Sequence, residues 1–106
     1  MMISRIWHGW TTPDNAAAYE TLLKTQVFPG IEEKRIKGYR GIELLQRPMG
    51  DEVEFITMMR FDSLDDIKAF AGEDFETAYV IEAARRLLKR FDARSQHYEL
   101  RDQRSY

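Results

Sequence analysis

Two strand-like runs joined by a short turn constrain the fold of this chain most strongly. The runs cover residues 39–47 and 53–61, and the turn between them contains Pro48, Gly50 and Asp51. Apolar and β-branched residues separated by so few turn residues are typical of an antiparallel β-hairpin. The chain must therefore fold around a sheet, and the remaining segments must supply the strands and helices that complete it.

A third strand and a first helix are expected before the hairpin. Residues 3–10 alternate isoleucine and tryptophan with other residues, as extended chains do. Thr12 suits the cap position of a helix, and Pro13 suits its first turn, where the missing N–H is not needed. We expect this helix to end at Pro29 and Gly30.

Two further helical stretches and a last strand are expected after the hairpin. Ser63 followed by acidic residues predicts a second helix, which Gly72 breaks or bends. Residues 75–80 are expected to begin another helical turn. Apolar spacing then predicts a final helix over residues 81–91 and a last strand over residues 94–101.

The order of these elements favours one fold class. A chain of 106 residues is the length of one domain, so residues 1–106 are treated as a single unit. The order strand, helix, strand, strand, helices, strand predicts an α+β, ferredoxin-like βαββαβ fold. Its four-stranded antiparallel sheet would have the order 4-1-3-2, with all helices on one face.

Apolar residues on both faces of this sheet predict a homodimer. In the run 53–61, one face carries Val53, Phe55, Met59 and Phe61, while the other carries Ile56 and Met58. Helices cover only one face, and no segment remains for the other. A second copy of the same sheet is the simplest cover; the alternative is a monomer with an unusually apolar sheet.

Composition excludes several classes of function. The chain has no cysteine, which removes disulfides, thiolate metal sites and thiol catalysis. A net charge of −2 argues against nucleic acid as a partner. No apolar run is long enough for a membrane helix, and the N-terminal residues lack the features of a secretion signal, so we expect no membrane partner and a cytoplasmic protein.

Few side chains suit catalysis. His8 and His97 are the only imidazoles, and two histidines without further ligands make a poor metal site, so none is predicted. Arg5, Arg40 and Arg60 lie inside predicted strands. Each of these arginines either forms a structural ion pair or holds an anionic, enolate-like ligand.

The numerous aromatic residues suggest a ligand. Most of them must form the core. A gap between the sheet and the helices that is lined by several of them would suit a flat, apolar molecule with a few polar tips. The helix break at Gly72, between Phe70 and Phe75, is a plausible mouth for such a pocket.

Short motifs spread along the chain resemble a known family. RIWHGWTTPDNAAAYETLL, KGYRGIELLQR, FDSLDDIKAFAGEDFETAYV and FDARSQHYEL are similar to segments of the antibiotic biosynthesis monooxygenase-like domains. These domains belong to the dimeric α+β barrel superfamily. The resemblance covers about residues 3–100, and it implies the same dimeric barrel.

The resemblance also implies a type of chemistry. The superfamily includes oxygenases that use neither metal nor prosthetic group and oxidise phenols and anthrones to quinones. It also includes haem-degrading enzymes with an Asn, Trp and His set. The matching positions here are Ser4, Phe70 and Tyr79, which disagree with that set. We therefore expect no cofactor.

An ungapped match to the family implies which residues form the site. It turns the even residues of the first strand toward the helices, whereas a register shifted by one turns Arg5 and Trp7 there instead. Under the first register His8 is the best candidate base. Tyr79 would bond a substrate oxygen, with His97 as a second candidate base. The candidate substrate-binding residues are Trp10, Phe70 and Phe75.

Three functions follow from these observations. The first is a cofactor-independent monooxygenase acting on a small aromatic or polyketide-like substrate. The alternative is a non-catalytic, small-ligand-binding or stress-related homodimer of the same fold. A third is an isomerase or decarboxylase, in which His8 or His97 moves protons without oxygen.

Overall fold

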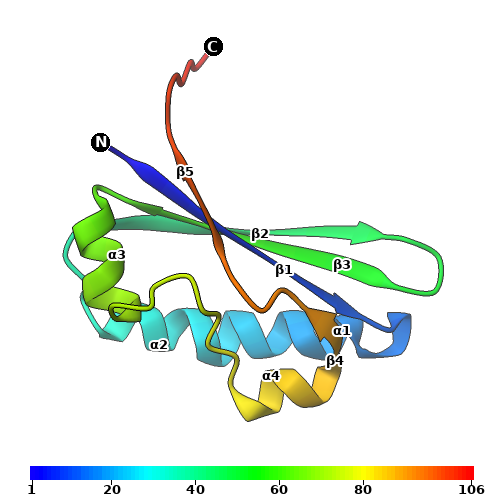
Figure 1. Ribbon diagram of the computed structural model, residues 1–106. Helices are drawn as coiled ribbons and strands as arrows, with labels where there is room; N and C mark the ends of the chain where they lie inside the picture. The colour runs from blue at the N-terminus through cyan, green and yellow to red at the C-terminus, as the bar shows by residue number, and fades with distance from the viewer.

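An antiparallel sheet forms one layer of the molecule, and the helices form the other (Figure 1). The structure is a computed structural model that describes all 106 residues. Its strands are β1 (Ile3–Thr11), β2 (Tyr39–Pro48), β3 (Val53–Phe61), β4 (Leu88–Phe91) and β5 (Gln96–Glu99). Their order is β2-β3-β1-β4, and β5 also pairs with β1. The α+β, ferredoxin-like fold and the strand order 4-1-3-2 are thus confirmed, with the fourth position shared by two short strands.

The helices all lie against the same face of the sheet (Figure 1). They are α1 (Pro13–Leu22), the π-helical turn η1 (Leu23–Val27), α2 (Phe28–Glu33), α3 (Leu64–Ala71) and α4 (Glu82–Leu87). Both predicted caps are confirmed: Thr12 accepts a hydrogen bond from the N–H of Asn15, and Ser63 accepts one from the N–H of Asp66. None of the helices is long and apolar enough to cross a membrane.

The first helix does not end at Pro29 and Gly30, as the sequence predicted. It continues through η1 into α2, as far as Glu33. The N–H of Phe28 bonds the carbonyl of Leu23, five residues back, so the usual ladder is already interrupted before Pro29. Pro29 then falls in the first turn of α2, where its missing N–H costs little.

The end of the chain also differs from the prediction. Residues 75–80 are irregular rather than helical, and the final helix stops at Leu87 instead of residue 91. Leu88 is already extended, with ψ 135°, and it begins β4. β4 pairs with one end of β1 and β5 with the other, so the predicted last strand is interrupted between them. Leu87 and Leu88 both fit the apolar spacing of a helix, so that spacing does not show where the helix ends and the strand begins.

The register of β1 is the reverse of the one implied by the family match. β1 and β3 pair without a slip over nine residues, from Ile3 opposite Phe61 to Thr11 opposite Val53. All buried residues of β1 are odd-numbered, and they face the helices together with the buried residues of β3. Arg5 and Trp7 therefore lie on the helix face, whereas His8 and Trp10 lie on the uncovered face.

Phe61 is the centre of one of the two apolar clusters between sheet and helices. Its ring is 0% exposed and contacts the rings of Tyr39 and Phe70, at centroid distances of 5.4 and 5.7 Å. Ile3, Met59 and Ile67 complete the buried part of the cluster. This cluster fixes α3 on the sheet.

Replacing Phe61 with alanine should lower the free energy of unfolding by about 3–5 kcal/mol, because a large cavity is left that its neighbours fill only partly. Denaturant unfolding at a fixed protein concentration measures the change. The matched control is Tyr79→Ala, whose ring is 89% exposed and whose loss should change stability by less than about 0.5 kcal/mol.

Candidate active site

Arg5 is an almost fully buried cation on the helix face of β1. Its residue exposure is only 7%. Its Nη1 donates a hydrogen bond of 2.5 Å to the carbonyl of Phe75, and its guanidinium lies 5.9 Å from the centre of the Phe70 ring. Burial lowers the pKa of Arg5, since the charged form loses its water.

Arg5 differs from the other strand arginines in having no carboxylate partner. Arg40 pairs with Asp62, and Arg60 pairs with Glu43 at 2.5 Å. These two arginines have the structural role that the sequence left as one alternative. Arg5 instead bonds only a carbonyl and a neutral ring, so its charge is not neutralised within the chain. A buried charge of this kind is costly for folding and favours an anionic ligand.

His97 lies beside Arg5, directly opposite it on β5. The Arg5 Nη1 and the His97 Nε2 are 2.8 Å apart. A guanidinium only donates, so Nε2 accepts and the proton of the neutral ring is on Nδ1. That Nδ1 is buried without a partner. Burial, followed by the positive charge of Arg5, lowers the pKa of His97 from its usual 6.5, which keeps the ring neutral at pH 7.

The irregular segment between α3 and α4 covers this pair. It begins at Gly72, whose φ of 90° is left-handed and suits glycine. The Phe75 carbonyl holds Arg5, and the Phe75 ring meets the His97 ring edge-on at 5.1 Å. The segment is tied to the start of β5 by the bond of 2.6 Å from the Ser95 N–H to the Glu76 carbonyl. Arg5, His97, Phe70 and Phe75 thus form one site of a cation, a neutral base and two apolar rings.

His8 and Trp10 lie on the other face of the sheet and do not join this site. The His8 Nδ1 is 2.8 Å from the Asp92 carboxylate, which also accepts bonds from the His8 N–H and the Gln96 amide. The His8 ring stacks on Trp10, with centroids 6.0 Å apart, and the Arg90 guanidinium lies 3.9 Å from the Trp10 ring centre. The predicted site residues are therefore divided between two faces.

Tyr79 does not reach either group. It lies in the irregular segment, its residue exposure is 89%, and it makes no hydrogen bond. No group of three or more His, Asp or Glu side chains is close enough to hold a metal ion.

The sequence did not identify Asp92, and it named Arg5 only as one of three equivalent arginines. Asp92 lies in the break between β4 and β5 and contacts His8, which is 84 positions away in the sequence. No local spacing indicates that contact. Arg5 was one of three strand arginines with the same alternatives. The β1 register, which buries Arg5, and its lack of a carboxylate partner separate it from the others.

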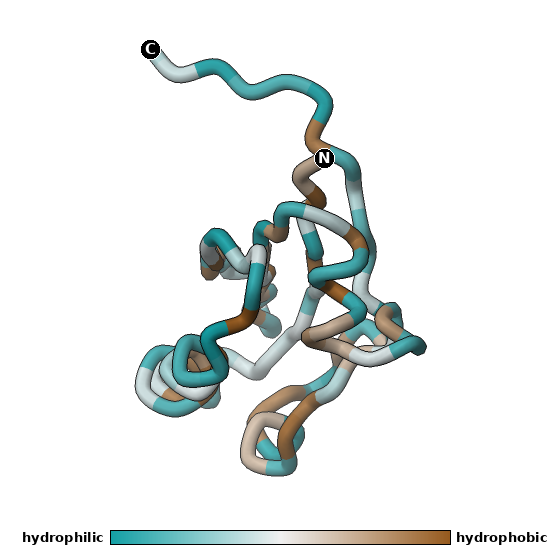
Figure 2. Tube along the Cα trace, turned by 90° about the vertical axis from the view of Figure 1, so that its left-hand side faces the viewer, coloured by the Kyte–Doolittle hydropathy of each residue, from teal (hydrophilic) through white to brown (hydrophobic).

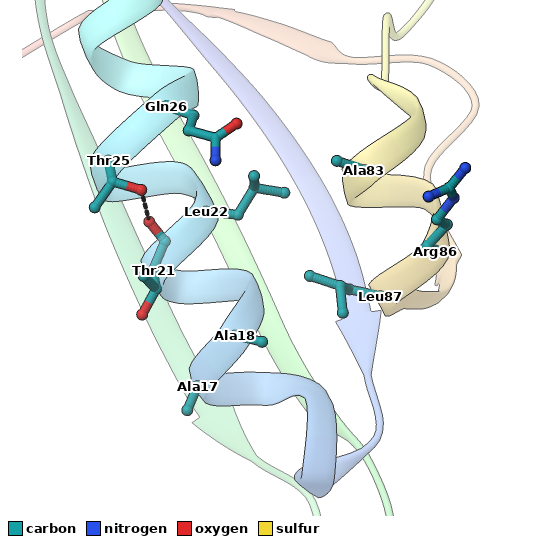
Figure 3. Close-up of a pocket in the computed structure, with 9 residues that line it drawn as sticks. All are labelled: Ala17, Ala18, Thr21, Leu22, Thr25, Gln26, Ala83, Arg86 and Leu87. Atoms are coloured by element: carbon teal, nitrogen blue, oxygen red, sulfur yellow. Dashed lines mark hydrogen bonds between the residues drawn. The ribbon is translucent and has the colours of Figure 1, made fainter.

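A hollow of the molecule lies elsewhere, on the outer side of the helices. It measures about 570 Å³ and runs between α1–η1 and α4, with Ala17, Ala18 and Ala83 among its small lining residues (Figure 3). Its only charged lining residue is Arg86, which is already paired with Glu82 at 2.9 Å. This groove therefore offers no group for acid–base chemistry.

Comparison with known proteins supports the fold. No protein-family model matches the chain, and no curated protein matches it significantly. Among solved structures, a candidate antibiotic biosynthesis monooxygenase from Bacillus cereus is 15% identical, with a TM-score of 0.71 over 99% of this chain and 98% of that one. Rv0793 from Mycobacterium tuberculosis is 19% identical, with a TM-score of 0.63 over 99% and 100%.

A third similar structure has a stated activity. SnoaB from Streptomyces nogalater, a cofactor-independent oxygenase, is 16% identical, with a TM-score of 0.59 over 96% of this chain and 95% of that one. At these identities the likeness concerns the fold. The chain therefore has the fold of the antibiotic biosynthesis monooxygenase-like proteins, over nearly its whole length.

Proposed function

We propose that this protein is a cofactor-independent monooxygenase acting on a small aromatic or polyketide-like substrate with an acidic proton. The observation that carries the proposal is the buried Arg5 cation bonded to neutral His97 between the Phe70 and Phe75 rings. A base next to an unneutralised cation suits a substrate that becomes an apolar anion. The shared fold with a cofactor-independent oxygenase supports the same class of reaction.

The proposed reaction needs only the substrate, oxygen and a base. The base removes a proton from an anthrone-type CH₂ or its enol, and the resulting anion gives electrons to O₂. One oxygen atom becomes a new carbonyl of the quinone, and the other leaves as water. The protein lowers the barrier by stabilising the anion and by excluding bulk water.

The contacts of Arg5 and His97 suggest how the pair would work. In the free protein, Arg5 occupies the Nε2 lone pair of His97. As the proton leaves, negative charge develops on a substrate oxygen, which becomes a stronger acceptor than imidazole and would draw the guanidinium to itself. The same shift would free the Nε2 lone pair to take the proton. Phe70 and Phe75 would form the apolar walls.

A second candidate function is a non-catalytic, small-ligand-binding or stress-related homodimer of the same fold. The observation that favours it is that Arg5, at 7% exposure, is almost fully buried and already bonded to His97 and to the Phe75 carbonyl, which leaves it little access to a substrate. A ligand seen by native mass spectrometry, together with an absence of oxygen uptake, would favour this function.

We also propose that the protein is a homodimer that buries the uncovered sheet face. This face, here called the open face, has an apolar centre and His8 beside Trp10; the apolar residues are Ile6, Leu45, Ile56 and Met58. Ion pairs form its rim, including Arg47 with Glu54 at 3.1 Å and Arg60 with Glu43. An apolar centre with a polar rim is typical of protein interfaces. A cytoplasmic location stays a prediction from the sequence.

Substitution of each histidine in turn tests which of the two faces of the sheet carries the catalytic base. With anthrones and hydroxynaphthalenes as substrates, His97→Gln should lower kcat/KM for oxygen uptake by roughly 10²-fold or more, because glutamine accepts the Arg5 bond but takes no proton. His8→Gln is the matched control and should retain turnover. Loss in His8→Gln alone would move the base to the open face, and an inert wild-type protein would contradict the oxygenase proposal.

The pKa of His97 should depend on Arg5. In the wild type, the His97 ring should gain its proton only below pH 6.5, since burial and Arg5 both disfavour the charged form. In Arg5→Met the positive charge is gone, so the midpoint should rise. NMR titration of the ring protons measures both midpoints, and His8→Gln identifies which signal belongs to His97. An unchanged midpoint would show that Arg5 does not act on His97.

The dimer should depend on the centre of the open face. Light scattering coupled to gel filtration should give about twice the chain mass of 12.6 kDa for the wild type. Ile56→Lys should shift the mass toward that of one chain, because a lysine buried between two sheets has no partner. Thr25→Lys, on the helix side, is the control and should leave the mass unchanged. A monomeric wild type at micromolar concentration would contradict the dimer.

A further inference from the structure

The irregular segment between α3 and α4 has few backbone bonds to the rest of the chain. Its residues, 72–81, are here called the strap, which lies on the helix side of the sheet (Figure 1). Two backbone hydrogen bonds connect it to the chain before β5. The Ala78 N–H donates to the Ala93 carbonyl at 3.0 Å, and the Ser95 N–H donates to the Glu76 carbonyl at 2.6 Å. A segment with so few bonds opens more easily than the helices and strands around it.

The outer side of the strap is open to water. The last residues of the chain, 101–106, extend away from the helices and do not cover it (Figures 1 and 2). Arg94 holds the strap from this side, with its Nη2 2.6 Å from the Glu76 carboxylate and 3.7 Å from that of Asp74. All three side chains are exposed, and ion pairs in water contribute little to stability. These contacts can therefore open at a small cost in free energy.

The inner side of the strap leaves polar groups of the site unsatisfied. Phe75 contacts both residues of the pair, through its carbonyl on Arg5 and its ring on His97. In this closed arrangement the charge of Arg5 has no anionic partner, and the buried His97 Nδ1 has no partner at all. A buried polar group without a partner destabilises the arrangement that contains it. An anionic ligand that reaches Arg5 would relieve part of this cost.

Gly72 provides a hinge at the start of the strap. Its φ of 90° and ψ of −179° lie in a region that glycine adopts far more readily than other residues. A Cβ at this position would meet no atom within 4 Å, so the glycine serves the conformation of the backbone and not the packing. At the other end, Ile81 is extended directly before α4. Residues at the ends of helices absorb the backbone rotation of a moving segment.

We propose that the strap is a lid, which moves away from β5 about Gly72 and Ile81 and so admits an anionic substrate to Arg5 and His97. This inference rests on the proposed site, and it adds the way into that site. When Phe75 moves, its carbonyl leaves Arg5, and a substrate oxygen, which is a stronger acceptor, takes that place. Arg94 bonds Glu76 again when the lid closes, and bulk water is excluded.

Amide exchange followed by NMR, without substrate, tests whether the strap opens by itself. The Ala78 and Ser95 amides should exchange at least tenfold faster than the β1 amides bonded to β3. Low concentrations of denaturant should hardly change their rates, because a local opening exposes little surface. Arg94→Gln should speed both amides further. Arg101→Gln, which breaks a similar exposed ion pair with Glu99, is the matched control and should not.

Exchange of these two amides at the rate of the β1 amides, and with the same dependence on denaturant, would overturn the lid. That result would mean that the strap opens only when the whole chain unfolds.

A disulfide across the strap tests whether opening admits the substrate. Thr77 and Arg94 form an antiparallel bridge that lies between the two backbone bonds, so their Cα atoms are about 4.5 Å apart, within the range of disulfides. The chain has no cysteine, so Thr77→Cys with Arg94→Cys supplies its only pair. The oxidised variant should show at least tenfold lower kcat/KM for oxygen uptake with anthrones than the same protein after reduction with a phosphine and desalting.

The single variant Thr77→Cys is the control, and the same reduction should leave its rate unchanged. Equal rates of the oxidised and reduced double variant would overturn the lid but leave the proposed oxygenase intact. An inert wild type would contradict the oxygenase, and the exchange rates alone would then decide whether the strap opens.

Discussion

The pairing of β1 with β3 determines most of what this molecule can do. Nine consecutive residue pairs run without a slip, so every side chain of β1 has a fixed face. A shift by one position would exchange the two faces completely. It would bring His8 under the helices and expose Arg5. The register thus decides which charged and aromatic groups are enclosed and which remain open to a partner.

The burial of Arg5 destabilises the fold. Arg5 gives up its water for one carbonyl and one imidazole nitrogen, and nothing in the chain neutralises its charge. Most buried arginines are paired, because an unpaired charge costs several kcal/mol. Features that destabilise a fold without structural benefit occur preferentially at functional sites. This cost is the physical reason to place the site at Arg5 and His97 rather than in the groove between α1–η1 and α4.

The sequence predicted the architecture well, because its signals are local. The hairpin turn, the caps at Thr12 and Ser63 and the end of the helix at Gly72 each depend on a few neighbouring residues. Which face of β1 turns toward the helices could not be predicted in this way. Ile3 and Trp7 lie on one face and Ile6 and Trp10 on the other, so both faces of the strand carry large apolar side chains. Only the partner strand resolves that choice. The contact of His8 with Asp92 likewise depends on a distant strand break that no spacing predicts.

Asp92 is held in common by the two faces of the sheet. Its backbone carbonyl accepts a bond of 2.8 Å from the Trp7 indole on the helix face, while its carboxylate holds His8 on the other. A residue inside a regular strand presents its side chain to one face only. The break between β4 and β5 removes that restriction. In evolutionary terms, position 92 is a joint constraint: the enclosed face and the open face cannot diverge independently while one residue serves both.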